Sequence, residues 1–141
     1  MSDYSKYLAI DYGEVRIGIA ICDELKILAR PFDVLKNDKL FKSKIEKIIL
    51  ENNISKIIIG LPLNMKGEKS AKTIETEKFK VDVLDKLNVE IIFLDERLTS
   101  KQAAYYNSEI NTKKKSRENK GNIDKYAATI ILQSYLDTVK R

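Results

Sequence analysis

Residues 6–22 decide the fold, and they read Lys-Tyr-Leu-Ala-Ile-Asp-Tyr-Gly-Glu-Val-Arg-Ile-Gly-Ile-Ala-Ile-Cys. Two apolar runs, 6–12 and 15–22, flank Gly13, which lets the chain turn tightly between them. The first run is apolar almost throughout, as is typical of a central strand that is buried on both faces. The stretch therefore predicts two neighbouring antiparallel strands.

A third strand is predicted at 26–36, and Pro31 within it indicates a sheet edge or a bulge. Short links join the three strands, which predicts an antiparallel meander. The apolar residues then change to helical spacing, first in a helix near 40–49 that Asp38 is expected to cap. The other expected elements are a strand at 56–59, a helix at 70–87, a strand at 90–94 and helices at 101–110 and 123–139, with loops at 61–67 and 111–122.

The order of these elements is βββαβαβαα. Strands that alternate with helices pair in parallel through right-handed crossovers, so the sequence predicts an α/β fold. We expect a mixed five-stranded sheet with helices on both faces. Because there is no internal repeat and no linker, residues 1–141 are expected to form a single domain. The carboxyl ends of the first, fourth and fifth strands then share one edge, where open α/β sheets bind ligands.

Composition excludes several kinds of chemistry. The chain has no histidine, which removes the usual general base, the Ser-His and Cys-His nucleophile pairs and most zinc sites. Cys22 is the only cysteine, so we expect a buried core thiol and no disulfide framework. The net charge of +5 suits a polyanionic partner. The sequence shows neither a signal-peptide core nor a membrane span, so a cytoplasmic location is expected.

Acidic residues stand where predicted strands end and where the last helix begins. Asp11 closes the first strand, Asp95 and Glu96 close the fifth, and Asp124 opens the last helix. Converging carboxylates repel each other unless a cation lies between them. Such oxygen ligands suit Mg²⁺ or Mn²⁺, so the pattern predicts a hard-metal site for phosphoryl chemistry. The alternative is that Asp11 only forms a turn and that Asp124 only favours a helix N-terminus.

The adjacent acids Asp95 and Glu96 cannot both face this site if the strand persists, because side chains alternate across a strand. We expect Glu96 to join Asp11 and Asp124 as a metal ligand. Asp95 then pairs with Arg97 or caps the next turn, and it stays among the candidate catalytic residues because it adjoins the site.

Basic residues near these acids are the candidate contacts to nucleic acid: Arg16, Arg97, Lys113, Lys114, Lys115 and Arg117. Arg16 follows Gly13 and could bind a phosphate with two hydrogen bonds, or pair with Glu14 on a solvent-facing strand. The loop at 113–117 precedes Asp124, although runs of like charge are usually solvated surface.

Four motifs occur in order along the chain. They are Asp-x-Gly-x-x-Arg-x-Gly from Asp11 to Gly18, Gly60-Leu61-Pro62 with Gly67 downstream, Asp-Glu-Arg-Leu-Thr from Asp95 to Thr99, and Asp124 ahead of Ala127-Ala128 and Ile131-Leu132-Gln133-Ser134-Tyr135-Leu136. Together they resemble the YqgF or RuvX-type family, whose members are described as Holliday-junction resolvases and as pre-16S rRNA nucleases. Ser100 departs from the frequent second Thr. The resemblance implies an RNase H-like fold and a divalent metal held at Asp11, Glu96 (or Asp95) and Asp124.

The expected function is metal-dependent hydrolysis of phosphodiester bonds in structured nucleic acid, foremost at the 5′ end of pre-16S rRNA. Junction resolution normally needs two sites related by a two-fold axis, and no isologous apolar interface is evident, so we expect a monomer. The alternatives are a Holliday-junction resolvase and a non-catalytic RNA-binding factor of ribosome assembly. An ATPase of the actin or sugar-kinase type would need a second Asp-x-Gly domain, which these 141 residues do not supply.

Replacing Lys113, Lys114, Lys115 and Arg117 together with Gln should weaken nucleic-acid binding and flatten its salt dependence. Each phosphate contact contributes a slope of roughly −0.7 to −0.9 in log K against log salt. Metal affinity should change little, because none of the four is a predicted ligand. Titrating labelled RNA at several salt concentrations measures the slope, and an unchanged slope would show that the run is only a solvated surface loop.

Overall fold

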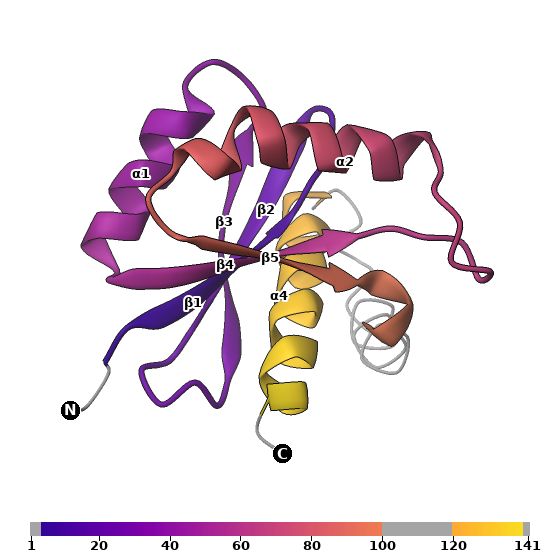
Figure 1. The fold of residues 1–141 in the computed structure, drawn as a ribbon. Helices are drawn as coiled ribbons and strands as arrows, with labels where there is room; N and C mark the ends of the chain where they lie inside the picture. Colours follow the sequence, from indigo (N-terminus) through magenta and orange to yellow (C-terminus); the bar gives the residue numbers. More distant parts are fainter. Residues whose placement is uncertain (1–3, 100–119, 140–141) are drawn as a thin grey trace.

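The computed structural model describes residues 4–99 and 120–139, which form a twisted sheet between helices (Figure 1). The elements in chain order are β1 (Lys6–Asp11), β2 (Arg16–Cys22), β3 (Ala29–Lys36), α1 (Phe41–Glu51), β4 (Ile54–Leu61), α2 (Ala71–Asp82), the 3-10 turn η1 (Leu84–Lys86), β5 (Glu90–Asp95), the 3-10 turn η2 (Glu96–Thr99) and α4 (Lys120–Val139).

The strands form one sheet in the order β3-β2-β1-β4-β5. β2 is antiparallel to both of its neighbours, β1 and β3. β4 is parallel to both of its neighbours, β1 and β5. The predicted meander and the mixed five-stranded sheet are therefore confirmed, with β1 in the centre. Pro31 lies in the edge strand β3 next to a register shift, so both features that it indicated, an edge and a bulge, are present.

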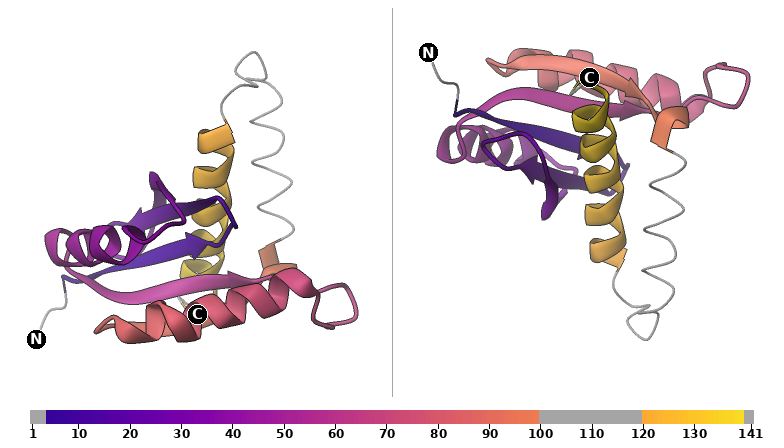
Figure 2. Two further views of the ribbon diagram at one scale, coloured as in Figure 1. Left: turned by 90° about the horizontal axis from the view of Figure 1, so that it is seen from above. Right: turned by 90° about the horizontal axis from the view of Figure 1, so that it is seen from below.

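Helices cover both faces of the sheet, as the sequence predicted. α1 and α2 lie on one face and α4 on the other (Figure 1, Figure 2). Side chains of β4 alternate between the two cores: Ile57 and Ile59 pack beneath α1 and α2, and Ile58 packs beneath α4. The core on the α4 side contains small residues such as Ala20 and Ala128, which let the helix come close to the strands.

Polar contacts fix where α4 lies on the sheet. The side chain of Gln133 accepts the N–H of Ala29 at 2.9 Å and donates to the carbonyl of Ile27 at 3.1 Å. Two residues further along α4, the hydroxyl of Tyr135 accepts a hydrogen bond from Lys56 Nζ at 2.9 Å. These contacts connect α4 to β3, to the turn before it and to β4, so the position of the helix along the sheet is set from both sides.

Several element ends differ from the prediction. α4 begins at Lys120, three residues before the predicted start, so residues 120–122 are helical and not loop. The predicted helix at 70–87 ends at Asp82, and η1 follows because the fully buried Leu84 is packed into the core. β4 is longer than predicted at both ends, and the helix predicted at 101–110 lies outside the described residues.

Leu40, and not Asp38, occupies the N-cap position of α1, so the predicted cap is wrong in its position. Asp38 instead accepts the N–H of Leu40 at 2.9 Å and stabilises the turn ahead of the helix.

Two expectations from composition can be compared with the structure. Cys22 is a buried thiol, as predicted; its Sγ accepts the N–H of Tyr7 at 3.2 Å, and burial raises its pKa. Among the helices of residues 4–99 and 120–139, none combines the length and the apolar character that crossing a membrane requires.

Replacing Leu132 with Ala should lower the free energy of unfolding by about 2–5 kcal/mol. Leu132 is fully buried between α4 and the sheet, so the truncation leaves a cavity. The matched control is Leu50→Ala on α1, where the side chain is 82% exposed and the change should stay within about 0.5 kcal/mol. Urea unfolding followed by circular dichroism compares the two, and equal effects would contradict this packing of α4.

Candidate functional site

Three neighbouring parallel strands end together at one edge of the sheet. The register of β1 against β4 puts Asp11 beside Gly60, and the register of β4 against β5 puts Asp95 beside Leu61. Neighbouring strands lie about 4.8 Å apart, so acids from distant parts of the chain become neighbours here. We call these carboxyl ends of β1, β4 and β5 the acid edge. Ligands of open α/β sheets bind at such edges.

Asp11 and Gly60 lie on the sheet face that α4 covers. Asp11 stands two residues after Ala9, and Gly60 two residues after Ile58, and both Ala9 and Ile58 belong to the core beneath α4. Because side chains alternate along a strand, Asp11 shares their face. The acid edge therefore has a helix-covered side, and the carboxylate of Asp11 is on that side.

The carboxylate of Glu96 lies directly over Gly60. A Cβ atom at position 60 would be 2.5 Å from Oε2 of Glu96 and 2.6 Å from Cδ1 of Ile131 on α4, so these side chains would have to move to admit one. Sequence reasoning placed Gly60 at the end of a strand and in the Gly-Leu-Pro motif, but it did not predict this contact. A single Gly closing the β-branched run of β4 was the available signal, because such a residue often marks a close approach.

Asp95 is turned towards Arg97. Its carboxylate accepts hydrogen bonds from the guanidinium: Nη2 donates to Oδ2 at 2.5 Å, and Nε is shared between Oδ2 at 2.9 Å and Oδ1 at 3.1 Å. Oδ1 also accepts the backbone N–H of Arg97 at 2.9 Å. These bonds hold the pKa of Asp95 below its usual value. Asp95 therefore both pairs with Arg97 and caps the next turn, the two roles that were expected as alternatives for it.

Glu96 has the opposite electrostatic setting. Burial raises the pKa of its carboxyl group, the positive charge of Lys72 in the first turn of α2 partly offsets that rise, and the nearby Asp95 adds to it. A carboxyl group that is harder to ionise than usual, in contact with a strand backbone and a helix, is typical of functional sites.

The remaining predicted residues are placed unevenly. Arg16 begins β2 and is partly exposed, and because Gly18 of β2 pairs with Asp11, it lies at the same end of the sheet as the acid edge. Asp124 belongs to α4, but its side chain lies outside the described part of the chain, and so do Lys113, Lys114, Lys115 and Arg117.

Gly13 serves the turn between β1 and β2. A Cβ there would collide with the carbonyl oxygen of Arg16, and Asn37 Nδ2 donates to the carbonyl of Gly13 at 2.9 Å. The glycine therefore brings the start of β2 close to the acid edge, which explains its place in the motif next to Asp11.

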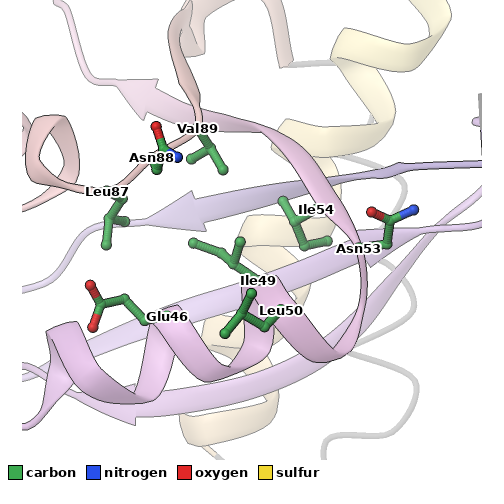
Figure 3. A pocket seen from close by; sticks show the side chains of 8 residues that line it. All are labelled: Glu46, Ile49, Leu50, Asn53, Ile54, Leu87, Asn88 and Val89. Carbon is green, nitrogen blue, oxygen red and sulfur yellow. The ribbon is translucent and has the colours of Figure 1, made fainter.

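A cavity of about 480 Å³ lies elsewhere, at the amino ends of β4 and β5 (Figure 3). It is bounded by the end of α1 and the segment before β5, and its lining is mostly apolar: Glu46, Ile49, Leu50, Asn53, Ile54, Leu87, Asn88 and Val89. Glu46 is the one ionisable side chain in this lining, so the cavity lacks the converging polar groups of a catalytic site.

The fold matches that of a solved nuclease. The structure of T. thermophilus RuvC in complex with a Holliday junction substrate superposes with a TM-score of 0.64, covering 96% of this chain and 95% of that one at 9% sequence identity. At that identity the match shows the fold alone, and it confirms the predicted RNase H-like architecture.

Sequence comparison identifies the family. The family model described as "RuvX: Holliday junction resolvase" matches residues 5–138. A protein of Sulfurihydrogenibium sp. (strain YO3AOP1) is 40% identical over 94% of this chain and 90% of its own length. One of Endomicrobium trichonymphae is 41% identical over 94% of this chain and 96% of its own. Both are named "Putative pre-16S rRNA nuclease". The chain belongs to the RuvX family, as its motifs predicted, and hence to the hydrolases that act on phosphodiester bonds of nucleic acid.

Replacing Glu96 with Gln should stabilise the protein at pH 7 in the presence of EDTA. Because burial raises the pKa of Glu96 above its ordinary 4.5, the folded protein holds this proton more tightly than the unfolded chain. The carboxyl group thus contributes stability below the unfolded pKa, and that stability is lost as the pH rises through the folded pKa. The advantage of the variant should therefore shrink as the pH falls towards 4.5.

Urea unfolding at pH 7 and near pH 4.5 measures this difference. The control is Glu24→Gln, which changes an exposed glutamate between β2 and β3. A pH-independent difference between Glu96→Gln and the wild type would contradict a partly buried carboxyl group with a raised pKa at position 96.

Proposed function

We propose that the protein is a divalent-metal-dependent nuclease whose ligands are Asp11, Glu96 and Asp124. The observation that carries the proposal is the Glu96 carboxylate, which the fold holds against Gly60 and α4 where burial raises its pKa. Withdrawing a carboxylate from water is costly unless a cation compensates it. Asp11 presents a second carboxylate on the same face of the acid edge.

The donor set fits a hard cation. Among the side chains that the structure describes, no group of three or more His, Cys, Asp and Glu could hold a metal ion, and the side chain of Asp124, which we propose as the third ligand, is not among them. Position 124 lies four residues before Ala128 and seven before Ile131, on the helical stripe that packs against the sheet. Carboxylate oxygens favour Mg²⁺ or Mn²⁺, and such an ion, when bound, would activate water and stabilise charge on the phosphate.

The chain's own residues orient these groups. Asp11 ends a strand that is hydrogen-bonded on both sides, by β2 and β4, so its backbone is held rigidly. The carboxylate of Glu96 lies next to Gly60, and so does the side chain of Ile131 on α4. Arg16, at the same end of the sheet, is the proposed contact to a substrate phosphate, and the basic loop at 113–117 is proposed to extend that contact.

The substrate that we propose is pre-16S rRNA near its 5′ end, since the curated relatives carry that name. Trimming one strand needs a single site, which agrees with a monomer acting in the cytoplasm. The family description favours a second candidate, the Holliday junction, which would require two acid edges in a two-fold symmetric dimer. A third candidate, a non-catalytic RNA-binding assembly factor, would bind the precursor without cutting it.

Asp11→Asn and Glu96→Gln should each reduce the cleavage rate by at least roughly 10–100-fold. That is the loss typical of residues that hydrogen-bond to a metal ligand, and a ligand itself should matter no less. Both variants keep the volume of the side chain and should fold, which the unfolding curves check. The assay offers 5′ fragments of pre-16S rRNA and four-way DNA junctions with Mg²⁺, Mn²⁺ or EDTA. The control is Asp33→Asn on the exposed edge strand β3.

Cleavage of the RNA alone supports the proposal, and cleavage of the junction by a dimer supports the second candidate. Full activity of Asp11→Asn, or activity in EDTA, would overturn the metal site. Tight binding of the RNA without cleavage of either substrate would favour the assembly factor.

A further inference from the structure

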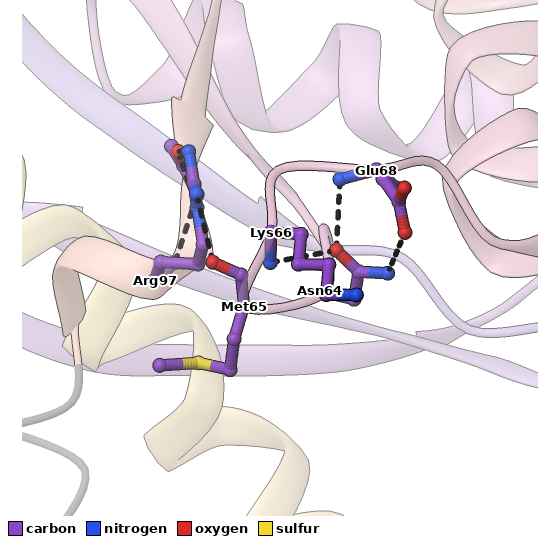
Figure 4. A network of polar contacts seen from close by, with 6 residues as sticks. Asn64, Met65, Lys66, Glu68 and Arg97 are labelled. Atoms are coloured by element: carbon purple, nitrogen blue, oxygen red, sulfur yellow. Dashed lines mark hydrogen bonds and ion pairs between the residues drawn. The ribbon is translucent and has the colours of Figure 1, made fainter.

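Residues 63–69 form a short hairpin that extends from the end of β4, and we call it the arm. Leu63 and Lys69 pair across its base, and Asn64 Oδ1 accepts the backbone N–H groups of Lys66 at 2.9 Å and Glu68 at 2.8 Å (Figure 4). A side chain that bonds two amides of its own turn replaces the hydrogen bonds that a longer hairpin would make. The arm is therefore a defined turn.

The base of the arm is attached to α2. The hydroxyl of Thr73 donates to the carbonyl of Pro62, and Ser70 and Thr73 form a capping box at the start of the helix. Lys69 also pairs with Glu77 of α2 at 2.9 Å. The arm thus leaves the sheet at a fixed point next to the acid edge.

Arg97 supports the tip of the arm from the other side. Its Nη1 donates a long hydrogen bond of 3.4 Å to the carbonyl of Met65 (Figure 4). Its guanidinium lies against Gly67, where a Cβ would be 3.2 Å from Nη1 and where the backbone has a φ of +81°. Glycine at position 67 therefore serves both the turn and the contact with Arg97.

We propose that the arm is a phosphate-binding element of the nuclease, that Lys66 at its tip makes the contact, and that Arg97 is a positioning residue that holds the arm. The inference rests on the proposed function for the identity of the ligand, the sugar-phosphate backbone beside the cleaved bond. Under this proposal Arg97 does not contact nucleic acid directly, as was expected from the sequence, but links Asp95 to the arm and holds the arm in place.

Charge distinguishes the two side chains. The guanidinium of Arg97 already bonds the Asp95 carboxylate through Nε and Nη2, so its charge is compensated within the protein. The ammonium group of Lys66 has no hydrogen bond or ion pair with any residue of the described ranges, and the side chain is exposed. A fixed backbone that presents an uncompensated ammonium group suits a phosphate as a point charge.

The first experiment measures the arm itself, by amide hydrogen exchange at Gly67 and Glu68. Arg97→Lys keeps the charge but loses the planar fork that spans Asp95 and Met65, so exchange at both amides should accelerate. Gly67→Ala should do the same while leaving the Asp95–Arg97 pair in place. Lys66→Gln should leave exchange unchanged. Protected amides in Arg97→Lys would overturn the role of Arg97 as a brace.

The second experiment measures binding, by titrating labelled pre-16S rRNA fragments into Asp11→Asn protein at several salt concentrations. Lys66→Gln should reduce the salt slope by roughly 0.7–0.9, the value of one phosphate contact. Gly67→Ala should reduce it similarly without removing a charge, and the double variant should show no further loss. Lys42→Gln on α1, which removes an exposed lysine away from the acid edge, is the matched control.

In proteins that retain Asp11, Lys66→Gln should raise KM more than it lowers kcat, by up to about fivefold for one exposed charge pair. Arg97→Lys should not rescue binding relative to Arg97→Gln, whereas a direct phosphate contact would be rescued by lysine. An unchanged salt slope in Lys66→Gln would overturn the phosphate contact. If no variant binds nucleic acid, the proposed function and the contact of Lys66 both fail, and hydrogen exchange alone then decides the role of Arg97.

Discussion

The contact between the Glu96 carboxylate and the backbone of Gly60 is the constraint on which the acid edge depends. Glu96 follows β5, and β4 lies between β5 and the strand of Asp11. Because neighbouring strands are about 4.8 Å apart, only the side chain of Glu96 can approach Asp11. Its side chain lies over β4 at position 60, where a Cβ would be 2.5 Å from Oε2. A carboxylate from β5 thus reaches the strand next to β1, on the face where Asp11 also lies.

The same position also lies against α4. A Cβ at position 60 would be 2.6 Å from Cδ1 of Ile131, so this side chain and the Glu96 carboxylate share the space over Gly60, where burial raises the pKa of Glu96. Gln133 and Tyr135 fix the helix to β3 and β4 further along, and small residues such as Ala9 let it come close to the strands. Burial of an acid opposes folding at neutral pH, and the largely apolar core on the other face of the sheet supplies compensating stability.

Much of the fold could be predicted from the sequence, because apolar periodicity, short links and a single edge proline decide it. The strand order and the edge where Asp11 and Glu96 end follow from that topology. The sequence could not show the ends of helices such as α4, which tertiary packing decides, or the N-cap of α1, where Asp38 and Leu40 compete. The position of Gly60 beneath a carboxylate was also hidden, because a strand-ending glycine has many causes.

The two adjacent acids Asp95 and Glu96 have different roles within one short motif. Because β5 ends at Asp95 and η2 begins at Glu96, the two side chains diverge to opposite sides of the chain. Asp95 uses Arg97 to fix its own turn and to contact the arm, whereas the carboxylate of Glu96 lies over Gly60 beside Ile131 of α4. Asp95 thereby stabilises the turn that aims Glu96, although it does not itself face the proposed metal. The change from strand to 3-10 turn between the two acids makes this division possible, and the arginine makes it rigid, since a guanidinium can bind both a carboxylate and a carbonyl.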